Sequence, residues 1–177
     1  VANGIADSDV RAGAGPAAID VELAPAPDGS SRRVRVGLPI CYELLFPDLV
    51  RRFVEDGAGV LLAITNDAWY GRTGAPYQFL AMTALRSAET GVYTVRAANT
   101  GVSAIIDGEG RVLDETPIFE VGYVIGDVPL LSPGAPRTFY ARQGDVFVWL
   151  CWLGVAGITA RAGWRSRGAA SGEPASL

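Results

Sequence analysis

Hydrophobic and polar residues alternate along residues 34–43, which read Val-Arg-Val-Gly-Leu-Pro-Ile-Cys-Tyr-Glu. Alternation with a period of two is typical of a β-strand that has one buried face. We therefore expect a strand over about residues 33–40, with Cys41 at its end. Glu43 follows two residues later, and continued strand geometry would place the side chains of Cys41 and Glu43 on the same side.

The pattern then changes to one of alternating strands and helices. Residues 59–65 are continuously apolar, which indicates a strand buried on both faces. Residues 77–90 repeat apolar side chains at helical spacing up to Gly91, and Phe-Pro-Asp at 46–48 predicts an earlier helix that ends at Gly57. Four further strands are expected, at about residues 92–98, 102–106, 111–114 and 121–127, with a hairpin turn at 107–110. The order β-α-β-α-β-β-β-β predicts an α/β domain with a mixed sheet.

The two ends of the chain differ from this middle part. Residues 1–32 are rich in Ala, Gly, Pro and Asp and show no signal-peptide pattern, so we expect a weakly structured approach. Because the chain begins with valine, we also expect it to be a piece of a longer protein.

Residues 146–160 form a charge-free apolar run near the C-terminus. As a helix the run spans roughly 22 Å, less than the roughly 30 Å of a hydrocarbon core, so a buried core helix is one interpretation. The nearby tryptophans, and the arginines gathered at one end only, favour a transmembrane helix over residues 145–162. By the positive-inside rule, residues 163–177 would then be a disordered cytoplasmic tail.

Composition excludes several functions. The chain has 177 residues, 49% of them hydrophobic, which is enough for one domain with a core. A net charge of −4 without a basic patch argues against a nucleic-acid partner. All 15 basic residues are arginine, with no lysine or histidine, which excludes within this chain a Ser-His-Asp triad, a Cys-His dyad, a histidine metal site and a lysine Schiff base.

Cys41 is the candidate nucleophile. A thiol at the end of a buried strand is rigidly held, and the next turn can direct backbone N–H groups at a developing oxyanion. Because an ordinary thiol is only a few per cent ionised at neutral pH, a cysteine nucleophile needs a base, which here must be a carboxylate or come from outside the chain. The alternative is that Cys41 is a small buried hydrophobe. Cys151 lies 110 residues away in an apolar run, so no disulfide framework is indicated.

Other candidate residues lie beside Cys41 and in the loop 66–71. Glu43 either orients the surroundings of the thiol or forms a salt bridge to Arg51 or Arg52, and core packing is expected for Tyr42. Asn66 and Asp67 either contribute to a site or form an Asx turn. Trp69 either lines a pocket or packs.

Three polar residues further along the chain are expected to be structural. Arg86 and Glu89, three residues apart on a helix, predict a surface ion pair. Arg96 is expected to hold the fold.

Five segments of the sequence together resemble the apolipoprotein N-acyltransferases, a membrane-bound family of the nitrilase (carbon–nitrogen hydrolase) superfamily. The similarity runs from about residue 33 to 161, and the first and last segments separate the acyltransferases from soluble nitrilases. The segments are Ile-Cys-Tyr-Glu (40–43), Asn-Asp-Ala-Trp-Tyr-Gly (66–71), Arg-Ser-Ala-Glu-Thr-Gly (86–91), Arg-Ala-Ala-Asn-Thr-Gly-Val-Ser-Ala-Ile-Ile-Asp (96–107) and Thr-Phe-Tyr-Ala-Arg-Gln-Gly-Asp (138–145).

The resemblance implies a fold and a location. We expect an α/β, nitrilase-like αββα sandwich, of which residues 33–140 form the C-terminal half, followed by one transmembrane helix. The enzyme would be a monomer in the inner membrane, without cofactor or metal, and its catalytic domain would face the periplasm.

The resemblance also implies a two-step acyl transfer. A cysteine takes an acyl chain from a phospholipid as a thioester, and the amino group of a diacylglyceryl-cysteine at an apolipoprotein N-terminus then receives it. Cys41 falls on the nucleophile, with Glu43 beside it in the catalytic site. Tyr42, Asn66 and Trp69 are the candidate substrate-binding residues.

The family's general-base glutamate and oxyanion-stabilising lysine lie upstream of the nucleophile. This chain has no lysine, and its only glutamate before Cys41 is Glu22, in an unmatched stretch. We therefore expect the isolated chain to be inactive and, without the rest of the sandwich, unstable. Two other interpretations remain: a soluble amidase or nitrilase of the same superfamily, and a non-catalytic membrane-anchored domain in which Cys41 is structural.

Overall fold

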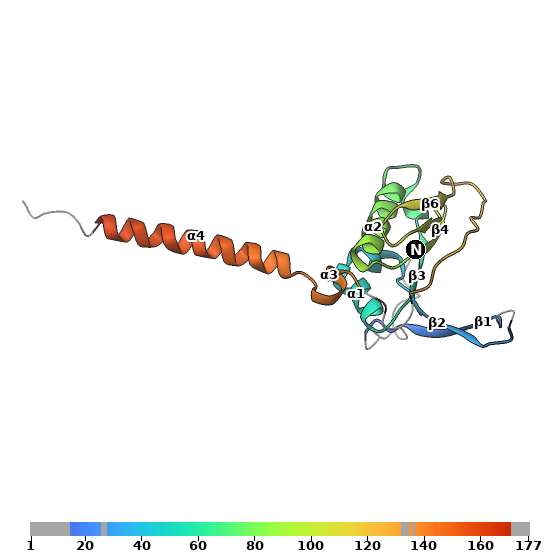
Figure 1. Cartoon of the computed structure of the whole chain (residues 1–177). Coiled ribbons are helices and arrows are strands. Elements are labelled where there is room, and N and C mark those ends of the chain that lie inside the picture. The colour runs from blue at the N-terminus through green and yellow to red at the C-terminus, as the bar shows by residue number, and fades with distance from the viewer. Residues whose placement is uncertain (1–14, 26–27, 132–134, 136, 171–177) are drawn as a thin grey trace, which may run out of the picture. The chain divides into compact units, whose positions relative to one another are not determined.

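The computed structural model describes residues 15–25, 28–131, 135 and 137–170 (Figure 1). The chain divides into two compact units, Val1–Arg142 and Gln143–Leu177. The first unit holds the sheet and the candidate site, and the second consists of the end of a short helix and one long helix.

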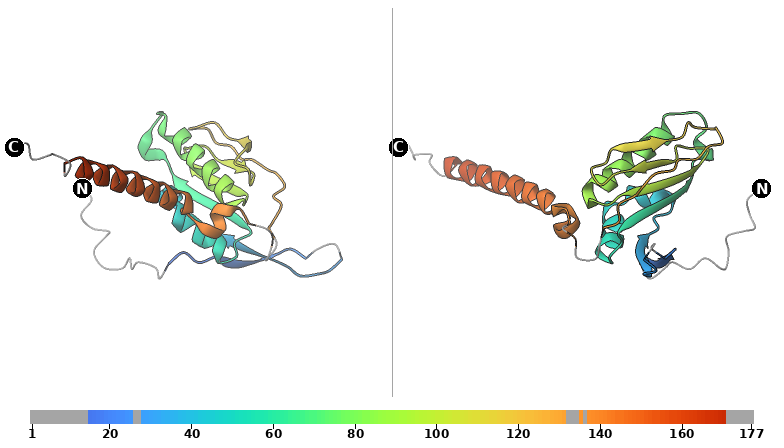
Figure 2. Two further views of the ribbon diagram at one scale, coloured as in Figure 1. Left: turned by 60° about the vertical axis from the view of Figure 1, so that its left-hand side comes forward. Right: turned by 45° about the vertical axis from the view of Figure 1, so that its right-hand side comes forward.

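A six-stranded mixed sheet forms the first unit, with its strands side by side in chain order (Figure 2). β2, β3 and β4 pair in parallel, and the remaining neighbours pair antiparallel. The strands are β1 (Ile19–Leu23), β2 (Arg32–Gly37), β3 (Val60–Asn66), β4 (Thr94–Asn99), β5 (Ala104–Ile106) and β6 (Val112–Glu115). The mixed α/β sheet predicted from the sequence is therefore confirmed.

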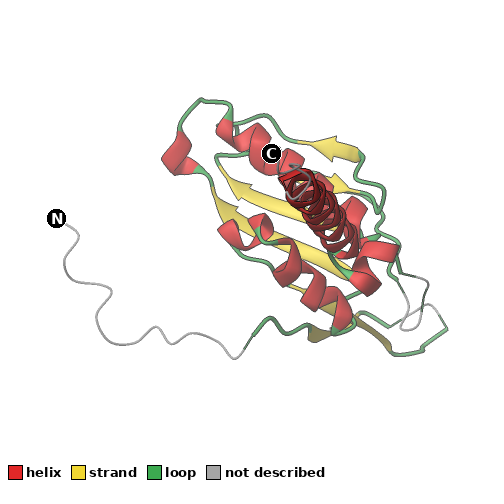
Figure 3. Ribbon diagram, turned by 90° about the vertical axis from the view of Figure 1, so that its left-hand side faces the viewer, coloured by secondary structure: helices red, strands yellow, loops and turns green. Residues whose placement is uncertain are grey.

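Two helices cross over between the parallel strands and cover the same face of the sheet (Figure 3). They are α1 (Pro47–Glu55) and α2 (Ala75–Thr90), and the 3₁₀ helices η1 (Cys41–Leu45) and η2 (Ala68–Tyr70) precede them. Gly91 ends α2 in the left-handed conformation, with φ 72°, and its N–H donates to the Ser87 carbonyl. α3 (Phe139–Gln143) follows later, and the Thr138 hydroxyl before it donates to the Glu89 carbonyl at the end of α2.

The main core lies between α1 and the sheet. Leu61 and Ala63 of β3 point towards the helices and pack with Val50, Phe53 and Val54 of α1. The opposite face holds a smaller cluster around Val34, Val36 and Val60. On that second face Ile64 is 48% exposed, so the described residues cover it only in part.

β1 corrects the expectation of a weakly structured approach at Ile19–Leu23, whereas residues 1–14 and 26–27 of that approach lie outside the described part. Ile19, Val21 and Leu23 alternate with acidic residues, and the strand pairs antiparallel with β2. Glu22 pairs with Arg33 and Asp20 with Arg35, so complementary charges on adjacent strands accompany the pairing. The alternation is short and lies among prolines and glycines, which is why the turn signals dominated the prediction.

The strand predicted at 121–127 is wrong. Those residues are irregular, and the side chains of Val121, Tyr123 and Ile125 are exposed. Gly122 and Gly126 interrupt the alternation, and glycine weakens a strand because it loses more conformational freedom and has no side chain to pack.

The second unit contains α4 (Val146–Ala170), a single continuous helix. Among the helices of the described residues, none combines the length and the hydropathy needed to cross a membrane. The transmembrane helix predicted at residues 145–162 is therefore not confirmed. The tail expected to be disordered from residue 163 is helical up to Ala170, and residues 171–177 lie outside the described part.

Candidate functional site

The candidate nucleophile lies in a strained turn just after β2. Pro39 has no N–H to continue the ladder, and Ile40 makes a single parallel bridge to Ile64 of β3. Cys41 then begins η1 with φ 52°, a conformation that few residues other than glycine adopt. The predicted strand therefore gives way to a 3₁₀ turn before Cys41, and strand geometry does not relate Cys41 to Glu43. The thiol is free and half-buried.

Glu43 forms two hydrogen bonds with Ile40 that close this turn. Its carboxylate Oε2 accepts a hydrogen bond of 2.7 Å from the Ile40 N–H, and its own N–H donates to the Ile40 carbonyl at 3.0 Å. The alternative of a salt bridge to Arg51 or Arg52 is wrong: neither pairs with Glu43 in the part of the chain that the structure describes, and Arg51 pairs with Asp48 and Glu55. Glu43 thus holds the backbone on both sides of Cys41.

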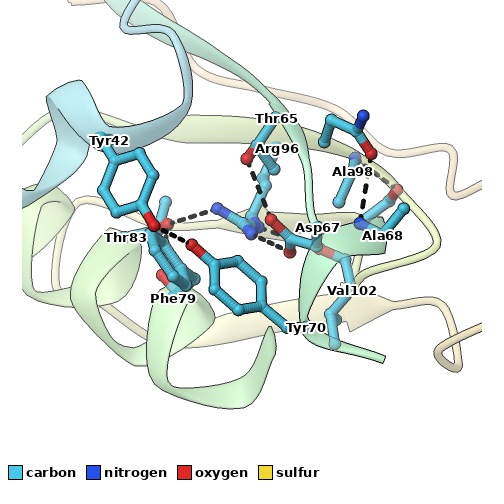
Figure 4. Close-up of polar contacts among 12 residues, drawn as sticks. Tyr42, Thr65, Asp67, Ala68, Tyr70, Phe79, Thr83, Arg96, Ala98 and Val102 are labelled. Atoms are coloured by element: carbon cyan, nitrogen blue, oxygen red, sulfur yellow. Dashed lines mark hydrogen bonds and ion pairs between the residues drawn. The ribbon is translucent and has the colours of Figure 1, made fainter. Parts of the chain in front are cut away.

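Tyr42 does not pack into the core as expected. Its side chain is exposed, and its hydroxyl shares a hydrogen bond with the hydroxyl of Tyr70 on η2 (Figure 4). Both rings lie against Phe79 of α2, with ring centroids 5.6 Å and 5.4 Å away. The hydrogen bond to Tyr42 raises the pKa of Tyr70 to about 12, because it stabilises the neutral phenol.

A buried ion pair between Asp67 and Arg96 holds the start of η2. Asp67 directly precedes η2, and its Oδ2 lies 2.7 Å from Nη2 of Arg96 on β4. The two side chains are 1% and 0% exposed. Burial lowers the pKa of Arg96 and the charge of Asp67 opposes this, so the guanidinium remains charged.

The remaining donors of Arg96 are satisfied by its surroundings. Nε donates to the Val102 carbonyl at 3.1 Å, and Nη1 to the Thr83 hydroxyl of α2 at 3.2 Å (Figure 4). Thr65 donates to the second oxygen of Asp67 at 3.0 Å. Arg96 therefore links β4, α2 and the loop after β3, as its expected role in holding the fold requires.

Asp67 is the residue whose role the sequence left undecided. Gly101 approaches it so closely that an added Cβ would lie 2.8 Å from its Cβ and Cγ atoms. The pairing of Asp67 with Arg96 had one signal in the sequence. Asp67 directly follows β3, and Arg96 lies on the neighbouring parallel strand β4, three residues before its end.

Asn66 and Trp69 occupy the same loop in different ways. The Asn66 side-chain oxygen accepts hydrogen bonds from the Ala68 N–H and from the Asn99 side-chain amide, both at 3.2 Å. Asn66 thus forms the Asx turn that was one of its two predicted roles. Trp69 is 82% exposed, so the interpretation of Trp69 as a packing residue is wrong.

The predicted surface pair of Arg86 and Glu89 also needs correction. The ion pair is present at 3.1 Å, but the Arg86 side chain is only 6% exposed and that of Glu89 22%. α2 therefore turns this pair towards the body of the unit rather than towards solvent.

A cavity of about 400 Å³ lies beside the nucleophile turn. Ile40 and Glu43 line it on one side, Leu49 and Phe53 of α1 on another, and residues 15–17 complete it. The non-catalytic interpretation would be favoured by a deeply buried Cys41 with no cavity beside it and no reactivity toward an alkylating agent. Cys41 is half-buried, and its neighbours Ile40 and Glu43 line the cavity although Cys41 itself does not. The reactivity of the thiol stays a prediction. Within the described residues, no group of three or more His, Cys, Asp or Glu side chains is placed to hold a metal ion.

The sequence matches a known family model and several curated relatives. Residues 11–134 match the family model described as carbon-nitrogen hydrolase. The chain is 46% identical over 128 residues to the apolipoprotein N-acyltransferase of Geobacter metallireducens, an alignment that covers 72% of this chain and 24% of the relative. The corresponding proteins of Rickettsia bellii and Chlorobaculum tepidum are each 42% identical, over 63% and 72% of this chain and 22% and 23% of their own lengths. The chain thus spans about a quarter of the length of these curated relatives.

Proposed function

The chain belongs to the carbon–nitrogen hydrolase family, and from this membership we propose that it carries the nucleophile of an apolipoprotein N-acyltransferase. The observation that carries the proposal is the position of Cys41: a free, half-buried cysteine in a strained turn at the carboxyl end of a parallel strand, between Ile40 and Glu43, which line a cavity. Ligand and substrate sites in α/β folds lie at this edge of the sheet.

The proposed reaction has two steps. The Cys41 thiol gives its proton to the base, and the thiolate attacks the ester carbonyl of a phospholipid acyl chain. A thioester forms, and the lysophospholipid leaves with that proton on its oxygen. The amino group of a diacylglyceryl-cysteine at the N-terminus of an apolipoprotein then attacks the thioester. An amide forms, and the thiol is regenerated.

Glu43 and Tyr42 support this chemistry without taking part in the proton transfers. The Glu43 carboxylate is already occupied by the Ile40 N–H, so its role is to hold the nucleophile turn. We assign the general base and the oxyanion-stabilising cation to residues outside this chain, and we expect the chain alone to be inactive at neutral pH. A thiol of pKa about 8.5 is only a few per cent ionised there.

The proposal includes a membrane surface on the extracytoplasmic side as the place of reaction, because the acyl donor is a phospholipid. Exposed aromatic side chains on the two 3₁₀ helices and at the end of η1 support a lipid-facing site. Tyr42, Phe46 and Trp69 are 53%, 59% and 82% exposed. Apolar surface of this kind beside a nucleophile suits an acyl chain better than a small polar amide.

The test asks whether Cys41 accepts an acyl group when a high pH takes the place of the missing general base. The chain is incubated in detergent micelles with an activated long-chain acyl ester, at neutral pH and at alkaline pH, and the acylated cysteine is located by mass spectrometry. We expect an acyl thioester on Cys41 at alkaline pH, where hydroxide replaces the missing base, and its transfer to an S-lipidated peptide amine. The Cys41→Ala variant should lose this label and Cys151→Ala should keep it.

Two outcomes contradict the proposal. Acylation of Cys151 without acylation of Cys41 at any pH would remove Cys41 as the nucleophile. Transfer of the acyl group to water but not to the peptide amine would favour the amidase interpretation.

A further inference from the structure

Two tyrosine hydroxyls join the nucleophile turn to a separate part of the fold. Tyr42 follows Cys41 directly, Tyr70 ends η2, and 28 residues separate them in the sequence. Their hydroxyls are hydrogen-bonded to each other and their rings both contact Phe79 (Figure 4). This contact, which we call the tyrosine latch, bridges the ends of β2 and β3 through side chains.

Tyr70 forms one half of the tyrosine latch, and hydrogen bonds hold its backbone. The Tyr70 N–H donates to the Asp67 carbonyl at 3.1 Å, and the Asp67 N–H donates to the Asn99 carbonyl at 3.1 Å. The Asp67 carboxylate is held by Arg96, whose other donors reach α2 and the Val102 carbonyl. These contacts tie the residue that starts η2 to β4 and α2, so the backbone that carries Tyr70 is anchored at more than one element.

The other half of the tyrosine latch lies in the strained turn. A residue with φ near +52° keeps that conformation only where the surrounding structure fixes it. The Glu43 carboxylate fixes the backbone before Cys41 by accepting the Ile40 N–H. The Glu43 N–H also closes the turn across Cys41 by donating to the Ile40 carbonyl, but both Glu43 contacts stay within residues 40–43. Tyr42, the residue after Cys41, carries the side-chain contact that joins this turn to η2.

We propose that Tyr70 is a positioning residue for Cys41: its hydroxyl holds Tyr42, and through Tyr42 it keeps the nucleophile turn closed. Asp67 and Arg96 contribute indirectly to the same positioning, because they hold the 3₁₀ helix η2, which carries Tyr70. The inference rests on Cys41 as the proposed nucleophile, but its test measures the thiol alone and needs no acyl donor.

The experiment is the alkylation of the thiols by iodoacetamide at neutral pH in the full chain. Peptide mass spectrometry resolves Cys41 from the exposed Cys151, which serves as an internal reference in every sample. The variants are Tyr70→Phe, Tyr42→Phe and the double variant, each of which removes a hydroxyl and keeps the ring on Phe79. Tyr123→Phe is the matched control, because it removes an exposed hydroxyl from an irregular segment outside the site.

Loss of one neutral hydrogen bond should increase opening of the turn, and hence alkylation of Cys41, about fivefold. Since either hydroxyl alone cannot form the tyrosine latch, the two single variants and the double variant should react at the same rate. Cys151 should react unchanged in all of them, and Tyr123→Phe should match the parent at both cysteines.

Two results at Cys41, and a third at Cys151, overturn the inference. One is a Cys41 rate in Tyr70→Phe within twofold of the parent. The other is a double variant whose effect is the product of the two single effects, since independent contributions would mean that the hydroxyls do not act as a pair. If Tyr70→Phe changes Cys151 equally, the variant has loosened the whole chain, and the tyrosine latch is refuted as a local device.

Discussion

The buried pair of Asp67 and Arg96 gives the sharpest test of what holds the site together. The Asp67→Asn variant keeps the shape of the side chain and removes its charge. Arg96, whose side chain is fully buried, would then carry a charge without a counter-charge. Breaking a buried pair by removing one partner costs about 3–5 kcal/mol, because the remaining charge stays desolvated.

The lower end of this range applies here. An asparagine oxygen can still accept the hydrogen bond from Nη2, and the Thr83 and Val102 oxygens still accept from Arg96. A loss of about 3 kcal/mol in the free energy of unfolding corresponds to a fall of roughly 6–12 °C in the melting temperature for a chain of this size. Thermal unfolding followed by circular dichroism measures this directly.

An exposed pair in the same chain supplies the control. Arg33 and Glu22 join β1 and β2 at 3.1 Å, but their side chains are 62% and 74% exposed. Exposed pairs contribute about 0–1 kcal/mol, so Glu22→Gln should shift the melting temperature by less than about 4 °C. If Asp67→Asn shifts it no more than Glu22→Gln does, the buried pair contributes no more than a surface pair, and our account of its role is refuted.

Two further predictions concern the same region. Gly101→Ala would place a Cβ 2.8 Å from the Cβ of Asp67, so we expect a loss of about 1–3 kcal/mol in thermal unfolding, whereas Gly74→Ala, with nothing within 4 Å, should change little. In a titration of tyrosinate absorbance, the phenol of Tyr70 should ionise last, with a pKa of about 12, and Tyr42→Phe should return that pKa towards its usual value of about 10. Because the pKa is higher in the folded chain, the stabilisation is present below pH 10, about the unfolded value, and is lost as the pH rises through about 12. A Tyr42→Phe variant with an unchanged late phenol would contradict this.

The elements that the sequence predicted well are those whose signal is local. The continuous apolar run of β3 and the helical spacing of α2 each lie within one element, and Gly91 ends α2 in the left-handed conformation that favours glycine. β1 was missed because its pairing with β2 depends on cross-strand partners that a single short segment does not reveal. The strand expected at 121–127 failed for the opposite reason, since a local alternation found no neighbour to pair with.

The candidate site could be predicted only in part. Cys41 at the end of β2 followed from the alternating pattern, but Pro39 and the single bridge at Ile40 convert the next residues into a 3₁₀ turn. Strand geometry therefore misplaced Glu43 and Tyr42. The contacts that settle their roles, to the Ile40 N–H and to Tyr70, depend on that turn and on the packing of η2.

The three parallel strands explain why the segments that carry the family resemblance lie where they do. β2 ends at Gly37 before the turn of Cys41, β3 ends just before Asp67, and β4 carries Arg96 and ends at Asn99. Cys41 is the proposed nucleophile, whereas Asp67 and Arg96 bind each other and Asn99 binds Asn66. We infer that most residues of these segments act through position: a strained turn must be fixed from several elements before a single thiol can serve as the proposed nucleophile.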